Sequence, residues 1–130
     1  MKFVCFGYHD EARWQAQNDA ERNALMDDTF AYGRLLQKQG HIIDDRALQG
    51  AGSAAVLRFD KGNVAVTDGP FAETKEQLGG LIVLEASDLN EAIRLMSKMP
   101  CMRMGGSIEI RPVNEEIKFA PEASQTAAVN

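Results

Sequence analysis

Two segments of this chain are apolar on both faces of the strand that each would form. They are residues 2–8, KFVCFGY, and residues 81–86, LIVLEA. A strand with this composition is covered by other structure on both sides of its sheet. The chain has 130 residues, which is enough for one domain with one core. The fold must therefore place a layer on each face of a sheet.

Two helices are predicted, and each begins at a capping signal. The first begins at Asn18, which Glu21 completes as a capping box, and runs for about five turns to Gly40. The second begins at Asp88 and ends at Pro100, which cannot continue a helix. Apolar residues recur at helical spacing along both segments, so each helix has one buried face.

The remaining segments predict strands and connections. Residues 9–17 break the apolar pattern and are expected to form a loop, and residues 41–53 connect elements after at most a short strand. Residues 54–67 alternate around the turn DKGN and predict a β-hairpin, and residues 106–113 predict the last strand. Residues 115–130 are small and polar and predict a flexible tail behind a domain of residues 1–114.

The order of these elements predicts an α+β fold. Two helices in this arrangement cover one face of an antiparallel sheet, as in the ferredoxin-like split βαβ plan. The apolar second face then needs another cover, and a second copy of the same sheet supplies it most simply. We expect a homodimer whose two sheets form an α+β barrel, with a cleft between the sheets or beside their rims.

The chain resembles the YCII-related family in its DGPF-type branch. The features that agree, in order, are YHDEARW, NDAER, VAVTDGPFAETKEQLGG, LIVLEASDLNEAI and GSIEIRPV. The resemblance covers about residues 1–114 and implies a ferredoxin-like, dimeric α+β barrel. It also implies two kinds of role, because some members look like lyases acting on small aromatic compounds and others occur with extracytoplasmic-function sigma factors.

One position departs from the pattern of the family. Members of the shorter YCII type carry a histidine in the first helix, which is thought to act with an aspartate as an acid–base pair. The corresponding residue here is Thr29. Threonine does not exchange protons near neutral pH as imidazole does, so the acid–base pair of the family is not carried over.

The motif VTDGPFAETKEQLGG, residues 66–80, has two interpretations. In the first it is a rigid corner, with Gly69 in an unusual backbone conformation, Phe71 as an apolar anchor, and residues 73–76 on one helical turn. In the second it is a lid that turns Asp68 and Glu73 towards a cleft. Both hold together if a rigid loop positions those side chains.

Other candidate residues lie near strand ends. His9 stands beside two carboxylates, Asp10 and Glu11, and it acts as a base, binds a metal or lies in a solvated loop. Glu109 and Arg111 share one face of the last strand, where they form an ion pair or bind a ligand, with Arg111 holding a carboxylate or phenolate. Tyr8 and Trp14 supply an aromatic wall or simply pack.

Composition narrows the function classes. A formal net charge of −5 gives nucleic acid no general attraction, and no apolar run approaches the ~20 residues of a membrane span. We therefore expect a cytoplasmic protein. Cys5 and Cys101 make no disulfide framework, and Cys5 is predicted to be buried. The sequence has no Cys/His metal spacing and no phosphate-binding glycine loop, so we expect neither a metal nor a cofactor.

Three functions remain. The first is a noncatalytic small-molecule-binding or regulatory dimer, with a link to sigma-factor regulation that rests on the resemblance. The second is a lyase or isomerase acting on a small aromatic or carboxylated compound, with acid–base work shared among Asp68, His9 and Glu109. The third is a structural dimer without a ligand. The residues expected to bind the ligand are Arg111, Phe71, Glu73, Tyr8 and Trp14.

Overall fold

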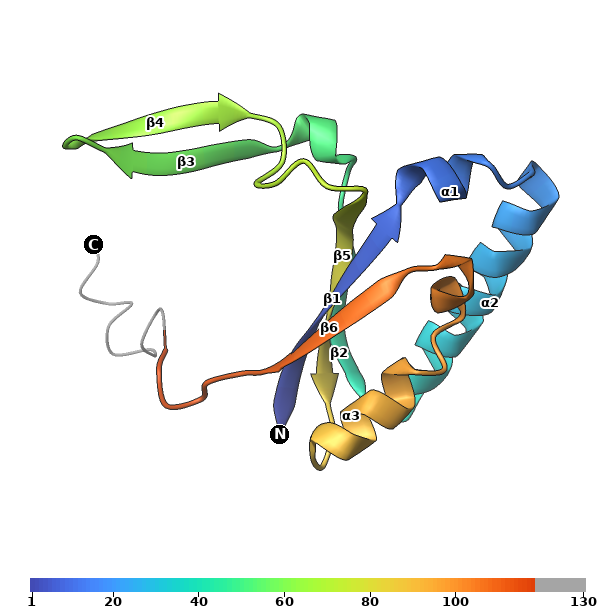
Figure 1. The fold of residues 1–130 in the computed structure, drawn as a ribbon. Coiled ribbons are helices and arrows are strands. Elements are labelled where there is room, and N and C mark those ends of the chain that lie inside the picture. Colours follow the sequence, from blue (N-terminus) through green and yellow to red (C-terminus); the bar gives the residue numbers. More distant parts are fainter. Residues whose placement is uncertain (119–130) are drawn as a thin grey trace, which may run out of the picture.

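The structure is a computed structural model that describes residues 1–118, and its centre is a four-stranded antiparallel sheet (Figure 1). The strand order is β2 (Ile42–Ala47), β5 (Glu76–Glu85), β1 (Lys2–Asp10) and β6 (Ser107–Pro112). If the hairpin β3–β4 is set aside, this is the order of the ferredoxin-like plan, in which the first and third strands are central. The predicted α+β, ferredoxin-like fold is confirmed.

Helices lie on one face of the sheet (Figure 1). They are α1 (Glu11–Gln15), α2 (Asp19–Lys38) and α3 (Leu89–Met96), with two short 3₁₀ turns, η1 (Ala51–Ser53) and η2 (Pro100–Met104). The predicted capping box of α2 is present, because the Asn18 side chain accepts a hydrogen bond from the Glu21 amide and the Glu21 carboxylate accepts one from the Asn18 amide. Asp88 caps α3 by accepting from the amide of Glu91 at 2.8 Å.

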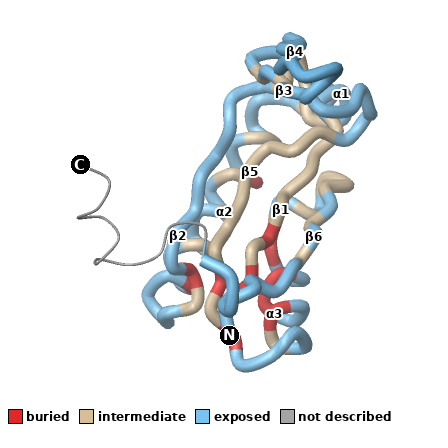
Figure 2. The backbone as a smooth tube through the Cα atoms, turned by 90° about the vertical axis from the view of Figure 1, so that its left-hand side faces the viewer, coloured by how far each residue is buried: buried red, intermediate tan, exposed pale blue. Residues whose placement is uncertain are grey.

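The core lies at one end of the layer between helices and sheet. Figure 2 shows the buried residues gathered towards α3, while the opposite end of the sheet is half-buried or exposed. The fully buried side chains of this core are Phe3, Leu36, Leu84, Met96 and Cys5. The burial of Cys5 agrees with the prediction. Because the core occupies one end, the other end of the layer is free to hold a site.

The face of the sheet away from the helices carries a second apolar group. Val4 lies opposite Val83, and Phe6 lies opposite Leu81. All four side chains point away from the helices, because Cys5 between them points into the core, and all four are half-buried. We call these four residues the open sheet face. The prediction of two strands that are apolar on both faces is confirmed.

A two-stranded ribbon stands apart from the sheet. It consists of β3 (Ala55–Asp60) and β4 (Asn63–Asp68), and we call residues 55–68 the arm. The hairpin predicted here is confirmed, with Gly62 at φ 83° in its turn, but it forms a sheet of its own. In Figure 1 the arm extends to the left of the sheet, whereas α2 lies to the right. The arm therefore projects on the side of the open sheet face.

Three local predictions were wrong. Residues 9–17 are not a loop, because β1 continues to Asp10 and the carboxylate of Asp10 caps α1 through the amide of Ala12 at 3.0 Å. No helical turn forms over residues 73–76, because Glu76 already begins β5. Pro100 begins η2 rather than ending α3. By contrast, the strand allowed for at the start of the segment 41–53 is present as the edge strand β2. The tail predicted for residues 115–130 lies outside the described residues from 119 on.

Candidate functional site

A cavity of about 660 Å³ lies between α2 and the sheet, at the end away from the core. Its walls include Gly7 of β1, Gly79 and Gly80 of β5, and Gly33 of α2. Gly7 and Gly80 are paired across the two central strands. Glycine has no side chain, so the helix and the sheet cannot fill the space between them here. The cavity is therefore a direct consequence of the glycines in these elements.

The rest of the lining is mainly apolar. It comprises, among others, Cys5, Leu25, Met26, Phe30, Ile82, Met99, Met102 and Ile108. Polar groups enter from Thr29 and from the mouth of the cavity, near the ends of β1 and β2. A concave, mostly apolar space of this volume with few polar groups is the usual form of a small-molecule site.

His9 lies at the mouth of the cavity, above a β-bulge of β5. The pairing of β1 with β5 shifts after Gly7, so that Gly79 is an extra residue of β5 without a partner in β1. The imidazole of His9 lies over this glycine, since a Cβ atom on residue 79 would stand 2.7 Å from His9 Nδ1. Glycine at the bulge thus makes room for the ring.

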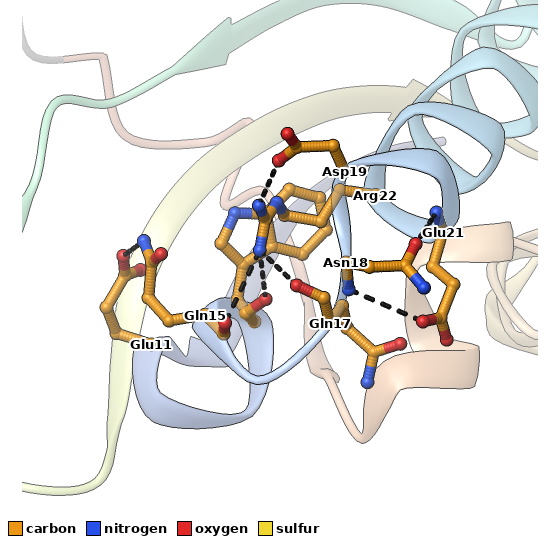
Figure 3. A network of polar contacts seen from close by, with 8 residues as sticks. Glu11, Gln15, Gln17, Asn18, Asp19, Glu21 and Arg22 are labelled. Atoms are coloured by element: carbon orange, nitrogen blue, oxygen red, sulfur yellow. Dashed lines mark hydrogen bonds and ion pairs between the residues drawn. The ribbon is translucent and has the colours of Figure 1, made fainter.

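A carboxylate orients the His9 ring. His9 Nε2 lies 2.9 Å from Glu11 Oε2, and Gln15 donates to Glu11 Oε1 at 2.8 Å; Figure 3 shows the contact between Glu11 and Gln15. These hydrogen bonds, first that of Gln15 and then that of His9, lower the pKa of Glu11. Glu11 is therefore ionised at neutral pH and can stabilise a proton on the imidazole.

The corner between α1 and α2 is fixed by one arginine. Arg22 donates to the backbone carbonyls of Trp14, at 3.3 Å, and of Gln17, and it pairs with Asp19 (Figure 3). Trp14 lines the cavity. The network holds the backbone of α1, and with it Trp14 and Glu11, beside the mouth of the cavity.

The two cysteines also line the cavity, but neither is an activated nucleophile. Burial raises the pKa of the Cys5 thiol to about 11. Cys101 in η2 is exposed as a residue, yet partial burial of its thiol raises its pKa as well. Both thiols are consequently protonated at neutral pH, and only the thiolate is a good nucleophile.

The predicted site residues lie in three separate places within one protomer. His9 and Trp14 line the cavity. Tyr8 also borders the cavity, but its hydroxyl lies on the other side of the sheet, where it donates to Glu109 Oε1 at 3.4 Å, and Arg111 shares that side because it pairs with Val4. Tyr8 and Trp14 thus both border the cavity, and the aromatic wall expected of them stays a prediction.

The residues of the DGPF motif form the third place. Asp68 ends the arm, and Glu73 lies in an exposed loop. Phe71 is 78% exposed and stacks only with Arg58, whose guanidinium is 5.2 Å from the ring centre, so the predicted apolar anchor is wrong for the described chain. Within one protomer, Asp68 and Glu109 do not join His9 at the cavity.

The backbone of the motif behaves as a rigid corner. Gly69 has φ 99°, as predicted, and its amide donates to Ala54 at 2.7 Å. The amide side chain of Gln77 donates to the carbonyls of Ala72, at 2.9 Å, and Thr74, at 2.8 Å. These bonds support the corner interpretation of the motif.

Sequence reasoning named Glu11 only as a neighbour of His9, and it missed the two bulge-side glycines as parts of a site. A signal for them existed, because glycines inside a strand often mark a bulge or a close approach of another group. Thr29, at the position of the family histidine, does line the cavity, and its hydroxyl donates to the Leu25 carbonyl at 2.8 Å. Among residues 1–118, no three His, Cys, Asp or Glu side chains gather as metal ligands. None of the helices described is long and apolar enough to cross a bilayer.

Comparisons with known proteins agree with this fold. The chain is 33% identical over 114 residues to an uncharacterised protein of Rhizobium meliloti (strain 1021), covering 87% of this chain and 92% of that protein. The fold is also similar to a solved structure, that of the 5-chloro-2-hydroxyhydroquinone dehydrochlorinase of Burkholderia phenoliruptrix AC1100 in complex with 2,5-dihydroxybenzoquinone. The TM-score is 0.51 and the sequence identity is 14%, and the match covers 88% of this chain and 94% of that chain. The YCII-related domain matches residues 1–117, and the chain belongs to that family.

Proposed function

We propose that this protein binds a small aromatic compound in the cavity between α2 and the sheet. The observation that carries the proposal is the glycine-walled space of about 660 Å³, apolar within and bearing one imidazole–carboxylate pair at its mouth. A flat ring fits between a helix and a sheet where side chains are missing, and the pair can bind a hydroxyl or an oxyanion of the ring. The enzyme with the similar fold was solved with an aromatic-derived quinone, which suggests the first probe.

Binding can be followed through the protein's own fluorescence. Trp14 is the only tryptophan in the chain, and it lines the cavity. We expect hydroquinone and 2,5-dihydroxybenzoquinone, added separately, to change its emission with a saturable dependence and to raise the melting temperature. A linear change without saturation, together with no thermal stabilisation by either compound, would count against the proposed site.

A cavity-filling variant locates the ligand. Gly33→Leu places a large side chain into the cavity from α2, where a Cβ atom meets nothing within 4 Å. Ala31→Leu adds the same side chain to an exposed position of the same helix and serves as the control. Gly33→Leu should fold and lose the fluorescence response, whereas Ala31→Leu should keep it. Unchanged binding by folded Gly33→Leu would place the ligand elsewhere.

Catalysis is the second candidate function, and the 2.9 Å contact between His9 and Glu11 favours it. In this form the protein is a lyase or isomerase, with His9 moving a proton of the bound compound and Glu11 stabilising the imidazolium. His9→Gln should then abolish turnover while binding persists. Asp68→Ala and Glu109→Gln test the wider acid–base set predicted from the sequence. Saturable binding without turnover of either probe favours the noncatalytic function.

The proposal includes a homodimer in which two open sheet faces pack together. Four half-buried apolar side chains on a face without helices support it, because such a surface is stabilised when water leaves it. We also infer membership in the DGPF-type branch from the motif at residues 66–80, and a cytoplasmic location from the composition. Sedimentation of the purified protein tests the homodimer.

A further inference from the structure

The arm carries an apolar face that nothing in the described chain covers. Leu57 lies opposite Val66, and Phe59 lies opposite Val64, so all four side chains share one side of the ribbon. Their exposed fractions are 68%, 65%, 76% and 60% in that order. A lone apolar residue on a surface is ordinary, but four adjacent ones on a projecting ribbon form a patch that indicates an interaction surface.

A ribbon of this kind needs a surface to pack on. An isolated two-stranded hairpin is at best marginally stable in water, and it becomes stable when an apolar face packs against other structure. The opposite side of the arm is more polar, because it carries Arg58, Asp60, Asn63 and Thr67 beside Val56 and Ala65. The sequence thus gives the arm one apolar side and one more polar side, although both are largely exposed to solvent in a single protomer.

The position of the arm identifies the surface that covers it. The arm projects on the same side as the open sheet face (Figure 1), and Figure 2 looks onto that side. A strand of six residues extends about 20 Å, whereas packed sheets lie about 10 Å apart. If a second copy packs on the open sheet face, the arm is therefore long enough to extend past the sheet of that copy.

We propose that the arm of each protomer packs the face formed by Leu57, Phe59, Val64 and Val66 on a second copy of this chain. The proposal rests on the homodimer proposed above and adds an exchanged contact to it. A two-fold axis makes the contact reciprocal, so that the arm of each protomer packs on the other protomer.

The size of the combined surface fits a stable dimer. A standard interface uses roughly 20–30 residues of each partner. Half the residues of the four-stranded sheet point away from the helices, and the arm adds one further apolar side. These outward-facing residues of the sheet number about 15, which is below this range, and one side of the arm adds about six and brings the total into it. The arm thus supplies the interface residues that the sheet alone lacks.

The test removes the apolar face without unpairing the ribbon. Phe59→Lys combined with Val64→Asp replaces one apolar cross-strand pair by an ion pair, which preserves the hairpin. Ala65→Asp is the matched control, because it places a carboxylate opposite Arg58 on the more polar side of the arm. Sedimentation at roughly 1–100 µM gives the dimer dissociation constant of each protein, and circular dichroism shows that each is folded.

We expect the double variant to raise the dissociation constant at least about 100-fold and the control to leave it within about threefold. Leu57→Lys with Val66→Asp repeats the measurement at the other cross-strand pair if the first variant does not fold. Equal dissociation constants for wild type and both arm variants would overturn the arm contact.

A variant of the open sheet face separates the two proposals. If Val83→Lys abolishes the dimer and the arm variants do not, the sheet contact stands and the arm contact fails. If wild-type protein is a monomer throughout the concentration range, both fail. Protection of the amides of residues 55–68 from hydrogen exchange that grows with protein concentration would support the arm contact independently.

Discussion

The imidazole of His9 lies directly over Gly79, and a Cβ atom on residue 79 would stand 2.7 Å from its Nδ1. This relationship joins the two features that define the site, the β-bulge of β5 and the imidazole–carboxylate pair. It also allows a simple test by substitution, because a Cβ atom on the next residue, Gly80, would meet backbone and not a side chain.

Gly79→Ala and Gly80→Ala should affect the stability of the protein to different degrees. At residue 79 the new methyl group meets the end of a half-exposed side chain, which can rotate away, so stability should change by less than about 0.5 kcal/mol while the His9–Glu11 contact is lost. At residue 80 it meets the backbone carbonyl of Arg46 at 2.9 Å, and unfolding should become easier by about 1–3 kcal/mol. Urea unfolding and the NMR signals of the His9 ring measure the two effects. Equal stability losses would show that the ring is not what Gly79 accommodates.

Gln15→Ala should raise the pKa of Glu11. The Gln15 hydrogen bond is the main cause of the low pKa, so removing it moves the titration of the carboxyl group towards its ordinary value. A depressed folded-state pKa adds stability at pH values above the unfolded-state pKa, and this stability disappears as the pH falls through the folded-state pKa. The stability difference between wild type and Gln15→Ala should therefore vanish in acid. Carbon-detected NMR titration follows Glu11 directly, and an unmoved midpoint would contradict the assignment.

Gly33→Ala should stabilise the protein by about 0.5–1 kcal/mol. Gly33 lies within α2, where alanine has a better helix propensity, and its Cβ atom would meet nothing within 4 Å. Thermal unfolding of wild type and variant gives the difference. A loss of stability would mean that a bound or packed group already occupies that part of the cavity.

The two cysteines should react in a fixed order. Cys101 is exposed and has a raised pKa, so its reaction with iodoacetamide should be slow at neutral pH and speed up as alkaline pH produces the thiolate. Cys5, with a pKa of about 11 and an exposed fraction of 2%, should react only when the protein unfolds. Mass spectrometry of the labelled protein at a series of pH values records both. Rapid neutral-pH labelling of Cys5 would show that the core opens readily.

Tyr32→Phe should cost about 1 kcal/mol of stability. The hydroxyl of Tyr32 donates to the carbonyl of Leu95 at 2.7 Å in a partly buried position, and this bond joins α2 to α3. Tyr8→Phe is the matched control, because its bond to Glu109 is 3.4 Å long and exposed, and it should cost less than about 0.5 kcal/mol. Chemical unfolding of the two variants side by side decides the matter, and equal costs would contradict the assignment.

The fold could be predicted because its signals are local and repeated. The capping residues Asn18 and Asp88 mark the starts of both long helices, and the apolar runs at residues 2–8 and 81–86 mark the two central strands. Each of these signals depends on residues a few positions apart, and the antiparallel pairing follows from their order.

The site could be predicted only in part, since it depends on register. Which residue of β5 lies beneath the His9 ring is decided by the extra residue at Gly79, because a shift of one residue in β5 reverses the face of every β5 residue beyond it. Counting along β1 alone identifies the faces of Tyr8 and His9 but not the cavity. The cavity itself results from missing side chains on three elements, and an absence of this kind becomes visible only when the elements are placed together.

The chain leaves the sheet after β2, forms the arm, and returns to the sheet as β5. The arm thus occupies the place where the ferredoxin-like plan needs only a tight turn between neighbouring antiparallel strands. Its length can change without altering a single residue of the core. If the arm contact proposed above holds, a homologue with this connection shortened would keep the fold and the cavity and differ in assembly, so that quaternary structure could change independently of the core.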